Sequence, residues 1–129
     1  MIQIVKVPLY KCQAAIMIES SLDEWKEFYA VQSKEGLLTS SNDASVEEEF
    51  ENKTPGFVFA TGLNTYVCYI SDKEDKGLVA HELFHLANAI LQDKCFIMDA
   101  NCEAWAYLIE FLTNEYYYTI ENFEQEKDE

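Results

Sequence analysis

The chain is poor in basic residues, with 9 Lys and Arg against 24 Asp and Glu, and its formal net charge is −15. Nucleic-acid binding draws its affinity from clustered Lys and Arg, so this composition argues against DNA or RNA as a partner. It argues against an anionic membrane surface for the same reason. A basic peptide or protein is the partner that such a charge attracts, although acidic surfaces also serve solubility alone.

The sequence also lacks any apolar run approaching the ~20 residues of a membrane span. Its first residues lack the basic start and apolar block of a secretory signal, so we expect a soluble, cytoplasmic protein unless a targeting segment has been removed. No CxxC pair occurs, which leaves a zinc ribbon or a thioredoxin-like motif without support. The cysteines have mostly apolar neighbours and fit small buried thiols in a reducing compartment, with a disulfide between Cys95 and Cys102 left open.

Apolar residues, by contrast, are plentiful. Hydrophobic residues make up 49% and aromatic residues 14% of the 129 positions, enough for one core and too few positions for two comfortable domains. We therefore predict a single α+β domain over residues 1–120. The acidic residues 121–129 are expected to form a tail that frays into solvent.

Local patterns predict the order of elements. The apolar residues at 2–8 and 12–19 predict two strands separated by a turn around Pro8 and Lys11. Ser21 and Glu24 have the spacing of a helix capping box. The remaining predictions are a helix at 21–32, a surface loop at 33–54 with at most one helical turn near 46–50, a hairpin formed by 56–61 and 65–71, and helices at 74–92 and 100–119.

The chain has two histidines, and they occur together as His81-Glu82-Leu83-Phe84-His85 in the predicted helix 74–92. Residues i and i+4 share one face of a helix, so both imidazoles can reach one ion from the same side. Zinc suits neutral imidazole, and a catalytic site takes three protein ligands and a water. Glu82 lies between the two ligands, where it can hold that water and accept its proton, as in the HExxH motif of metallopeptidases.

The surrounding helix is mostly apolar, and its polar residues form a stripe. His81, His85, Asn88 and Gln92 follow i, i+4, i+7, i+11 spacing and share one face. A helix that is apolar elsewhere is buried, and a buried polar stripe must find partners, so this stripe is typical of a cleft wall. The alternative is that the stripe faces solvent on a partly exposed helix and has no chemical role.

A third ligand has to come from another segment, because no third histidine exists. The HExxHxxGxxH class is excluded on that ground, and Asn88 stands where that class needs glycine. The helix at 100–119 offers Glu103, and a carboxylate that completes His2Glu is a known catalytic zinc set. Asp99 is the second candidate. Glu103 begins a polar stripe that can meet the histidine stripe at an ion, with members Glu103, Tyr107, Glu110 and Asn114.

The pattern His81-Glu82-x-x-His85 followed by Glu103-Ala104-x-Ala106 resembles the gluzincin branch of the zincins, and more narrowly small phage and bacterial zincin-like proteins. The specific match covers about 80–115. The resemblance implies a small antiparallel or mixed sheet packed on an active-site helix, which a glutamate-ligand helix follows. It further implies Zn²⁺ held by His81, His85 and Glu103, with Glu82 activating a zinc-bound water to hydrolyse peptide bonds. The hairpin 56–71 would then supply an edge strand along which an extended peptide substrate pairs.

The chain departs from the gluzincin pattern at two supporting positions. Many gluzincins place an aspartate four residues after the glutamate ligand to orient a histidine, and here Tyr107 stands there, with Glu110 as a substitute one turn on. Asn88, in the histidine stripe, is a candidate for either supporting role. Larger relatives use a separate histidine or tyrosine to stabilise the oxyanion, which leaves tyrosines as candidates in this chain: Tyr66, Tyr69, Tyr116, Tyr117 and Tyr118.

Three functions follow from these patterns. The first is a zinc peptidase acting on a protein or peptide. The second is a zinc-binding domain without turnover, an interaction or regulatory module of phage or mobile-element origin. The third is a structural domain whose polar stripes are solvated. The oligomeric state and the substrate do not follow from the sequence.

Overall fold

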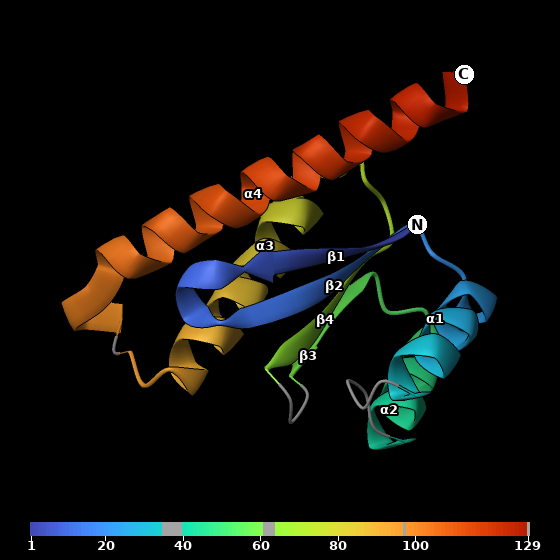
Figure 1. The fold of residues 1–129 in the computed structure, drawn as a ribbon, viewed down its shortest axis with the longest axis horizontal. Coiled ribbons are helices and arrows are strands. Elements are labelled where there is room, and N and C mark those ends of the chain that lie inside the picture. The colour runs from blue at the N-terminus through green and yellow to red at the C-terminus, as the bar shows by residue number, and fades with distance from the viewer. Residues whose placement is uncertain (35–39, 61–63, 97, 129) are drawn as a thin grey trace.

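The computed structural model describes residues 1–34, 40–60, 64–96 and 98–128, with the side chains of 40–43, 98–101 and 127–128 left out of the description. The fold is α+β, as predicted (Figure 1). The elements, in chain order, are β1 (Ile2–Val7), the 3-10 helix η1 (Pro8–Tyr10), β2 (Cys12–Ile18), α1 (Leu22–Lys34), α2 (Ser40–Glu51), β3 (Gly56–Ala60), β4 (Thr65–Ile70), α3 (Lys76–Asp93) and α4 (Met98–Asp128).

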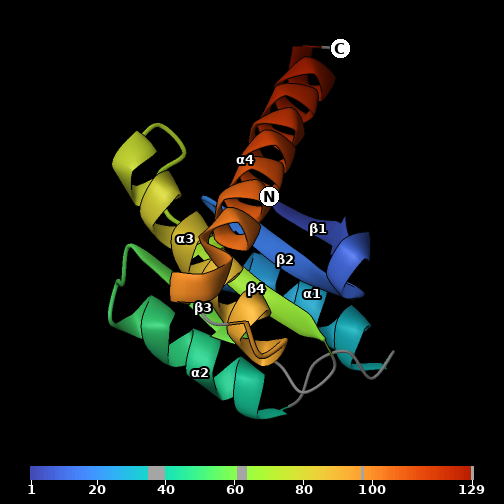
Figure 2. The same cartoon turned by 90° about the vertical axis from the view of Figure 1, so that its left-hand side faces the viewer.

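The strands form a mixed sheet in the order β1-β2-β4-β3. The pairs β1–β2 and β3–β4 are antiparallel, whereas β2 and β4 run parallel. Successive side chains of a strand face opposite sides of the sheet, so Tyr66, Cys68 and Ile70 join one core cluster and Val67 and Tyr69 join the other. Helices α3 and α4 cover the first face and α1 and α2 cover the second (Figures 1 and 2).

The predicted strands and hairpin are confirmed in type and position. The turn between β1 and β2 is closed by Lys11, whose left-handed backbone (φ 52°) ends the 3-10 helix. In the hairpin, Asn64 also has a left-handed backbone, with φ 55°. The rest of that predicted turn, residues 62–63, lies outside the described residues.

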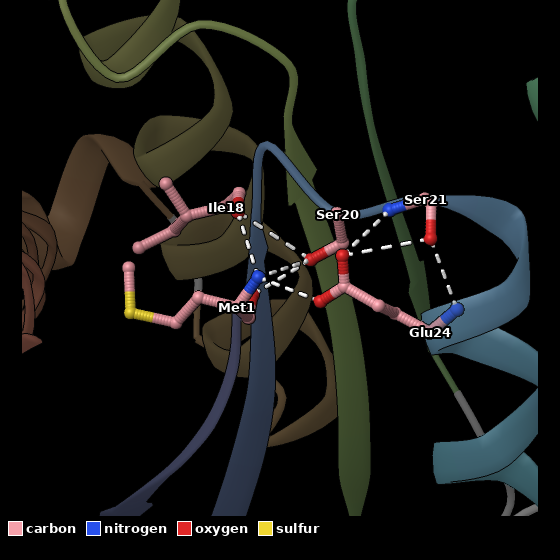
Figure 3. Close-up of polar contacts among 5 residues, drawn as sticks. All are labelled: Met1, Ile18, Ser20, Ser21 and Glu24. Atoms are coloured by element: carbon pink, nitrogen blue, oxygen red, sulfur yellow. Dashed lines mark hydrogen bonds and ion pairs between the residues drawn. The ribbon is translucent and has the colours of Figure 1, made fainter.

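The predicted capping box at the start of α1 is present (Figure 3). The amide of Glu24 donates to Ser21 Oγ at 3.1 Å, and the amide of Ser21 donates to Glu24 Oε1 at 3.2 Å. The other carboxylate oxygen of Glu24 accepts from the Met1 amino group at 2.9 Å. That hydrogen bond is the main reason why the pKa of Glu24 lies below its ordinary value. The Met1 amino group also donates to Ile18 O and Ser20 Oγ, so it ties the start of β1 to the segment that enters α1.

Replacing Ser21 with alanine is expected to lower the free energy of unfolding by about 1 kcal/mol, because the amide of Glu24 loses its capping acceptor. Urea unfolding of the purified protein measures this change. Ser33→Ala is the matched control, since the exposed Ser33 hydroxyl donates only to Ala30 O in the last turn of the same helix. Equal losses in the two variants would contradict a specific capping role for Ser21.

Helix α2 corrects the prediction of a surface loop over 33–54. The structure has a helix of 12 residues there, Ser40–Glu51, where only one helical turn was expected. Val46 is fully buried on the α1–α2 face of the sheet, and the Phe50 ring lies 4.9 Å from the Tyr69 ring. Val46 and Phe50 are four residues apart and share a helix face, so burial of this pair stabilises a helix in a polar sequence. Residues 35–39 lie outside the description.

Helix α4 is longer than predicted. The structure continues it to Asp128, so residues 121–128 are helical where the sequence indicated a frayed acidic tail. An ion pair ties this end to the segment before α3, since Lys73 Nζ lies 3.1 Å from Glu124 Oε1. Phe123 of the same end lines a groove together with Ile2 and Ile4 of β1. Within the described part of the chain, no helix combines the length and apolarity that crossing a bilayer requires.

All four cysteines are free thiols, so the disulfide left open between Cys95 and Cys102 is not formed in this structure. Cys12 and Cys68 are buried as expected, and burial raises the pKa of both thiols. Cys95 and Cys102 are exposed, which corrects the expectation that all four are buried.

Candidate metal centre

Helix α3 carries the histidine motif and packs its apolar stripe against the sheet. Asp75 caps the helix, since its side chain accepts a hydrogen bond from the amide of Leu78 at 3.0 Å. Val79, Leu83, Leu86 and Ile90 follow i, i+4, i+7, i+11 spacing and are buried in the core. The histidine stripe has the same spacing two positions later, and two positions turn a helix by about 200°. The histidines therefore project away from the sheet.

The two imidazoles converge on one point. His81 Nε2 and His85 Nε2 lie 3.1 Å apart, with ring planes at 74° to each other. A tetrahedral zinc ion about 2.05 Å from two histidine nitrogens would separate them by about 3.3 Å. The observed separation is close to this value, and it also fits a hydrogen bond between the two imidazoles. The His81 side chain is 64% exposed, so this point is open to solvent and to ligands. The histidine pair thus fits two of the ligands of a divalent metal.

Glu82 lies on the flank of α3 between the histidine stripe and the core. The residue is only 5% exposed, and its Oε1 lies 3.9 Å from His81 Nε2. Burial raises the pKa of Glu82 above its ordinary value, and the neighbouring His81 and His85 partly oppose this shift. A carboxylate with a raised pKa is a stronger base, and it stands beside the point on which the imidazoles converge.

The site opens into a cleft of about 400 Å³ between α3 and β3. Six of its lining residues come from the α3 helix and the rest from the first residues of β3. The lining residues are Gly56, Phe57, Val58, His81, Glu82, His85, Asn88, Ala89 and Gln92. All four residues of the polar stripe line this cleft, but His81, His85 and Gln92 are exposed, so the stripe faces solvent to a large extent, as the alternative interpretation expected.

Asn88, a polar residue of this wall, is hydrogen-bonded to a side chain of α4. Trp105 Nε1 donates to Asn88 Oδ1 at 3.3 Å. An indole N–H can only donate, so the oxygen of the amide must face Trp105 and the NH₂ group is left to face other partners. Trp105 was not singled out in the sequence, where a tryptophan in an apolar helix reads as core material.

The other wall of the cleft is an edge strand. β3 is the last strand of the sheet and pairs only with β4 among the described residues. Its outer edge therefore presents backbone N–H and C=O groups to which an extended peptide can add. Gly56 and Val58 were not predicted as site residues. A glycine at the start of a strand is a signal for close approach of another group, and it could have drawn attention to Gly56.

The structure does not bring Glu103 to the histidines. Glu103 is exposed near the start of α4 and does not line the cleft. Among the described side chains, no three His, Cys, Asp or Glu residues lie close enough to hold a metal. Trp105 faces Asn88 on α3, and two positions correspond to about 200° of helix rotation, so Glu103 points away from α3. The side chain of Asp99, the second candidate, lies outside the described side chains.

The two polar stripes accordingly do not meet in this structure. The four stripe residues of α4, from Glu103 to Asn114, are all exposed. Tyr107 is 67% exposed and Glu110 is also on the surface, and neither lines the cleft or contacts a histidine in this structure. The third ligand and the support of the histidines by Tyr107 or Glu110 stay predictions.

The tyrosines proposed as oxyanion donors lie elsewhere. The hydroxyl of Tyr66 donates to Asp93 Oδ2 at 2.6 Å, at a helix position about 12 Å beyond His85 along the axis. Tyr69 belongs to the core cluster on the α1–α2 face of the sheet. Tyr116 is buried in the core on the α3–α4 face, and Tyr117 and Tyr118 are exposed on α4. None of the five tyrosines lines the histidine cleft.

Comparisons with protein-family models, with curated proteins and with solved structures found no match to this chain. The functional argument therefore depends on the residues and geometry of the site itself.

Proposed function

We propose that the chain is a zinc-dependent peptidase of the gluzincin type, with His81 and His85 as metal ligands and Glu82 as the general base. The observation that carries the proposal is the 3.1 Å separation of the two Nε2 atoms beside a buried carboxylate. Metal ligands, a general base and a cleft occur together in hydrolases, and here the histidine pair, the carboxylate and the cleft come from one helix and the adjacent strand. The finer fold assignment, a zincin-like arrangement of sheet and helices, is part of the same proposal.

The chain's own residues have distinct tasks in this reaction. A bound zinc ion would supply a Lewis acid that polarises the scissile carbonyl and lowers the pKa of a water molecule. The Glu82 carboxylate accepts the proton of the attacking water and returns it to the nitrogen of the leaving amine. Water thereby adds across the C–N bond, and a carboxylate and an amine leave. Asn88, oriented by Trp105, is placed to donate its NH₂ group to a substrate carbonyl in the cleft.

The substrate is an extended peptide segment in this proposal. The outer edge of β3 offers backbone hydrogen bonds that do not depend on sequence, and the cleft between β3 and α3 receives the scissile bond. The net charge of −15 favours substrates with basic residues at long range.

The third ligand in this proposal is a carboxylate from the start of α4, Glu103 first and Asp99 second. Glu103 is exposed and faces away from α3 in the structure. Its participation requires a rearrangement that brings the Glu103 side chain to the histidines. Coupling of metal binding to such a local rearrangement is common, because the binding free energy contributes to folding of the site.

A protease assay with a chelator control tests the proposal. Protein purified without a histidine tag and loaded with one equivalent of Zn²⁺ is expected to release fluorescent peptides from labelled casein, and 1,10-phenanthroline is expected to stop the release. Full activity in the chelator would exclude a zinc mechanism. Binding of one zinc per chain without hydrolysis of casein or of a basic peptide library would favour the second function, a zinc-binding domain without turnover. The surface position of Glu103 does not distinguish these two functions, because both need a third ligand, and it favours the third function, a structural domain with solvated polar stripes.

A further inference from the structure

Gly56, the first residue of β3, lies directly against the side chain of Glu82. A Cβ atom added to Gly56 would stand 2.7 Å from both Cγ and Cδ of Glu82 and 2.8 Å from its Oε1. Contacts under 3.0 Å are essentially never made by real Cβ atoms. The buried carboxylate of Glu82 therefore occupies the space that any other residue at position 56 would fill.

Glycine is needed at position 56 because Glu82 leaves no space for a Cβ atom, and not because the backbone has a conformation that only glycine adopts. The φ angle of Gly56 lies outside the left-handed region, so an L-residue would fit the backbone. Gly56 pairs with Ile70 in a regular antiparallel ladder. Among the described residues, it is the close approach of Glu82 that leaves no room for a side chain at position 56.

We propose that Gly56 is a positioning residue, whose bare backbone sets where the Glu82 carboxylate lies relative to His81 and His85. The catalytic meaning of this inference rests on the proposed function, whereas the contact itself does not. The atoms that a methyl group would meet all belong to the Glu82 side chain and none to the backbone. Alanine at position 56 therefore displaces the carboxylate and leaves the strand in place. A misplacement of about 1 Å can lower a rate by about 100-fold.

A double-mutant cycle in urea tests the contact without metal or substrate. Gly56→Ala is expected to lower the urea midpoint in the wild-type background, where the methyl group collides with Glu82. In the Glu82→Ala background the same substitution is expected to leave the midpoint unchanged or raise it, because the obstacle is gone and alanine restricts the unfolded chain. The same shift of the midpoint in both backgrounds would overturn the inference.

Gly77→Ala is the matched control for this cycle. Gly77 lies in the first turn of α3, and a Cβ there would meet only Asp75 Oδ1 at 3.5 Å, an ordinary van der Waals distance. Alanine has a higher helix propensity than glycine, so Gly77→Ala is expected to raise the urea midpoint. The increase should be the same in the wild-type and in the Glu82→Ala background. Coupling of Gly77 to Glu82 as large as that of Gly56 would also overturn the inference.

A kinetic measurement tests the catalytic meaning. Zinc-loaded Gly56→Ala is expected to keep one zinc per chain and its KM for labelled casein, while kcat falls by about 100-fold. An unchanged kcat together with coupling in the cycle would show that the contact is only structural and would overturn the positioning role. Absence of hydrolysis by the wild-type protein would instead refute the proposed function, and the cycle would still decide whether Gly56 sets the position of Glu82.

Discussion

Replacing His81 or His85 with alanine is expected to abolish stoichiometric zinc binding. The Nε2 atoms of these residues converge to 3.1 Å, so each variant removes one of the two imidazoles that define the site. Second-shell partners of metal sites are worth about 10- to 100-fold in affinity, and the loss of a direct ligand should exceed this range. Elemental analysis after dialysis measures the result as a fall from about one zinc per chain to a trace.

Phe84→Ala is the control for the histidine variants. Phe84 lies between the two histidines in sequence and its ring lies 6.1 Å from that of His85, but it offers no metal-binding atom, so its truncation removes neighbouring bulk and no candidate ligand. We expect this variant to keep its zinc. Retention of one zinc per chain in both histidine variants would refute the site on α3, and the peptidase proposal would fall with it.

Zinc titration of variants at the start of α4 identifies the third ligand. Glu103→Gln is expected to weaken zinc binding, and Glu110→Gln, which changes another exposed glutamate two turns further along α4, is not. Loss of affinity in Asp99→Asn with no change in Glu103→Gln would move the ligand to Asp99. Either result would place the start of α4 at the metal, although Glu103 is exposed in the structure.

Replacing Glu82 with glutamine is expected to remove hydrolysis while leaving zinc in place. Glutamine has nearly the shape of glutamate but cannot accept the proton of the attacking water, and general acid–base catalysis contributes about 10²- to 10⁴-fold to a rate. The residue is buried, and the substitution removes a negative charge that burial disfavours, so the fold should tolerate it. Release of fluorescent peptides from casein and elemental analysis are measured on the same sample.

Glu74→Gln is the matched control for that variant, because it makes the same chemical change at an exposed residue just before α3. We expect it to keep both zinc and activity. Wild-type activity in Glu82→Gln would end the catalytic claim and would point to a contaminating protease or another base. The metal claim would stand, since Glu82 is not one of its ligands.

The fold was predictable where local signals were strong. The two strands at the N-terminus, the hairpin and the capping box of α1 follow from alternating apolar residues and from Ser21 and Glu24. Helix α2 was not predictable in this way. Its sequence is mostly polar, and the burial of Val46 and the packing of Phe50 on Tyr69 stabilise it only once the sheet exists. The helical end of α4 likewise depends on a distant residue, Lys73.

The candidate site likewise has a part that the sequence predicts and a part that depends on tertiary packing. Convergence of His81 and His85 and the position of Glu82 beside them follow from helix geometry, because residues i and i+4 share a face in any α-helix. The sequence by itself therefore determined the convergent histidine pair and the candidate base beside it. Which residues face the histidines across the cleft depends on how other elements pack on α3. Tertiary structure alone decided that β3 closes the cleft, that Gly56 makes room for Glu82, that Trp105 holds Asn88, and that Glu103 lies on the surface. These contacts join residues distant in sequence. The spacing of Trp105, Leu108 and Leu112 shows that they share a face of α4, but only their burial in the core decides which element that face packs on.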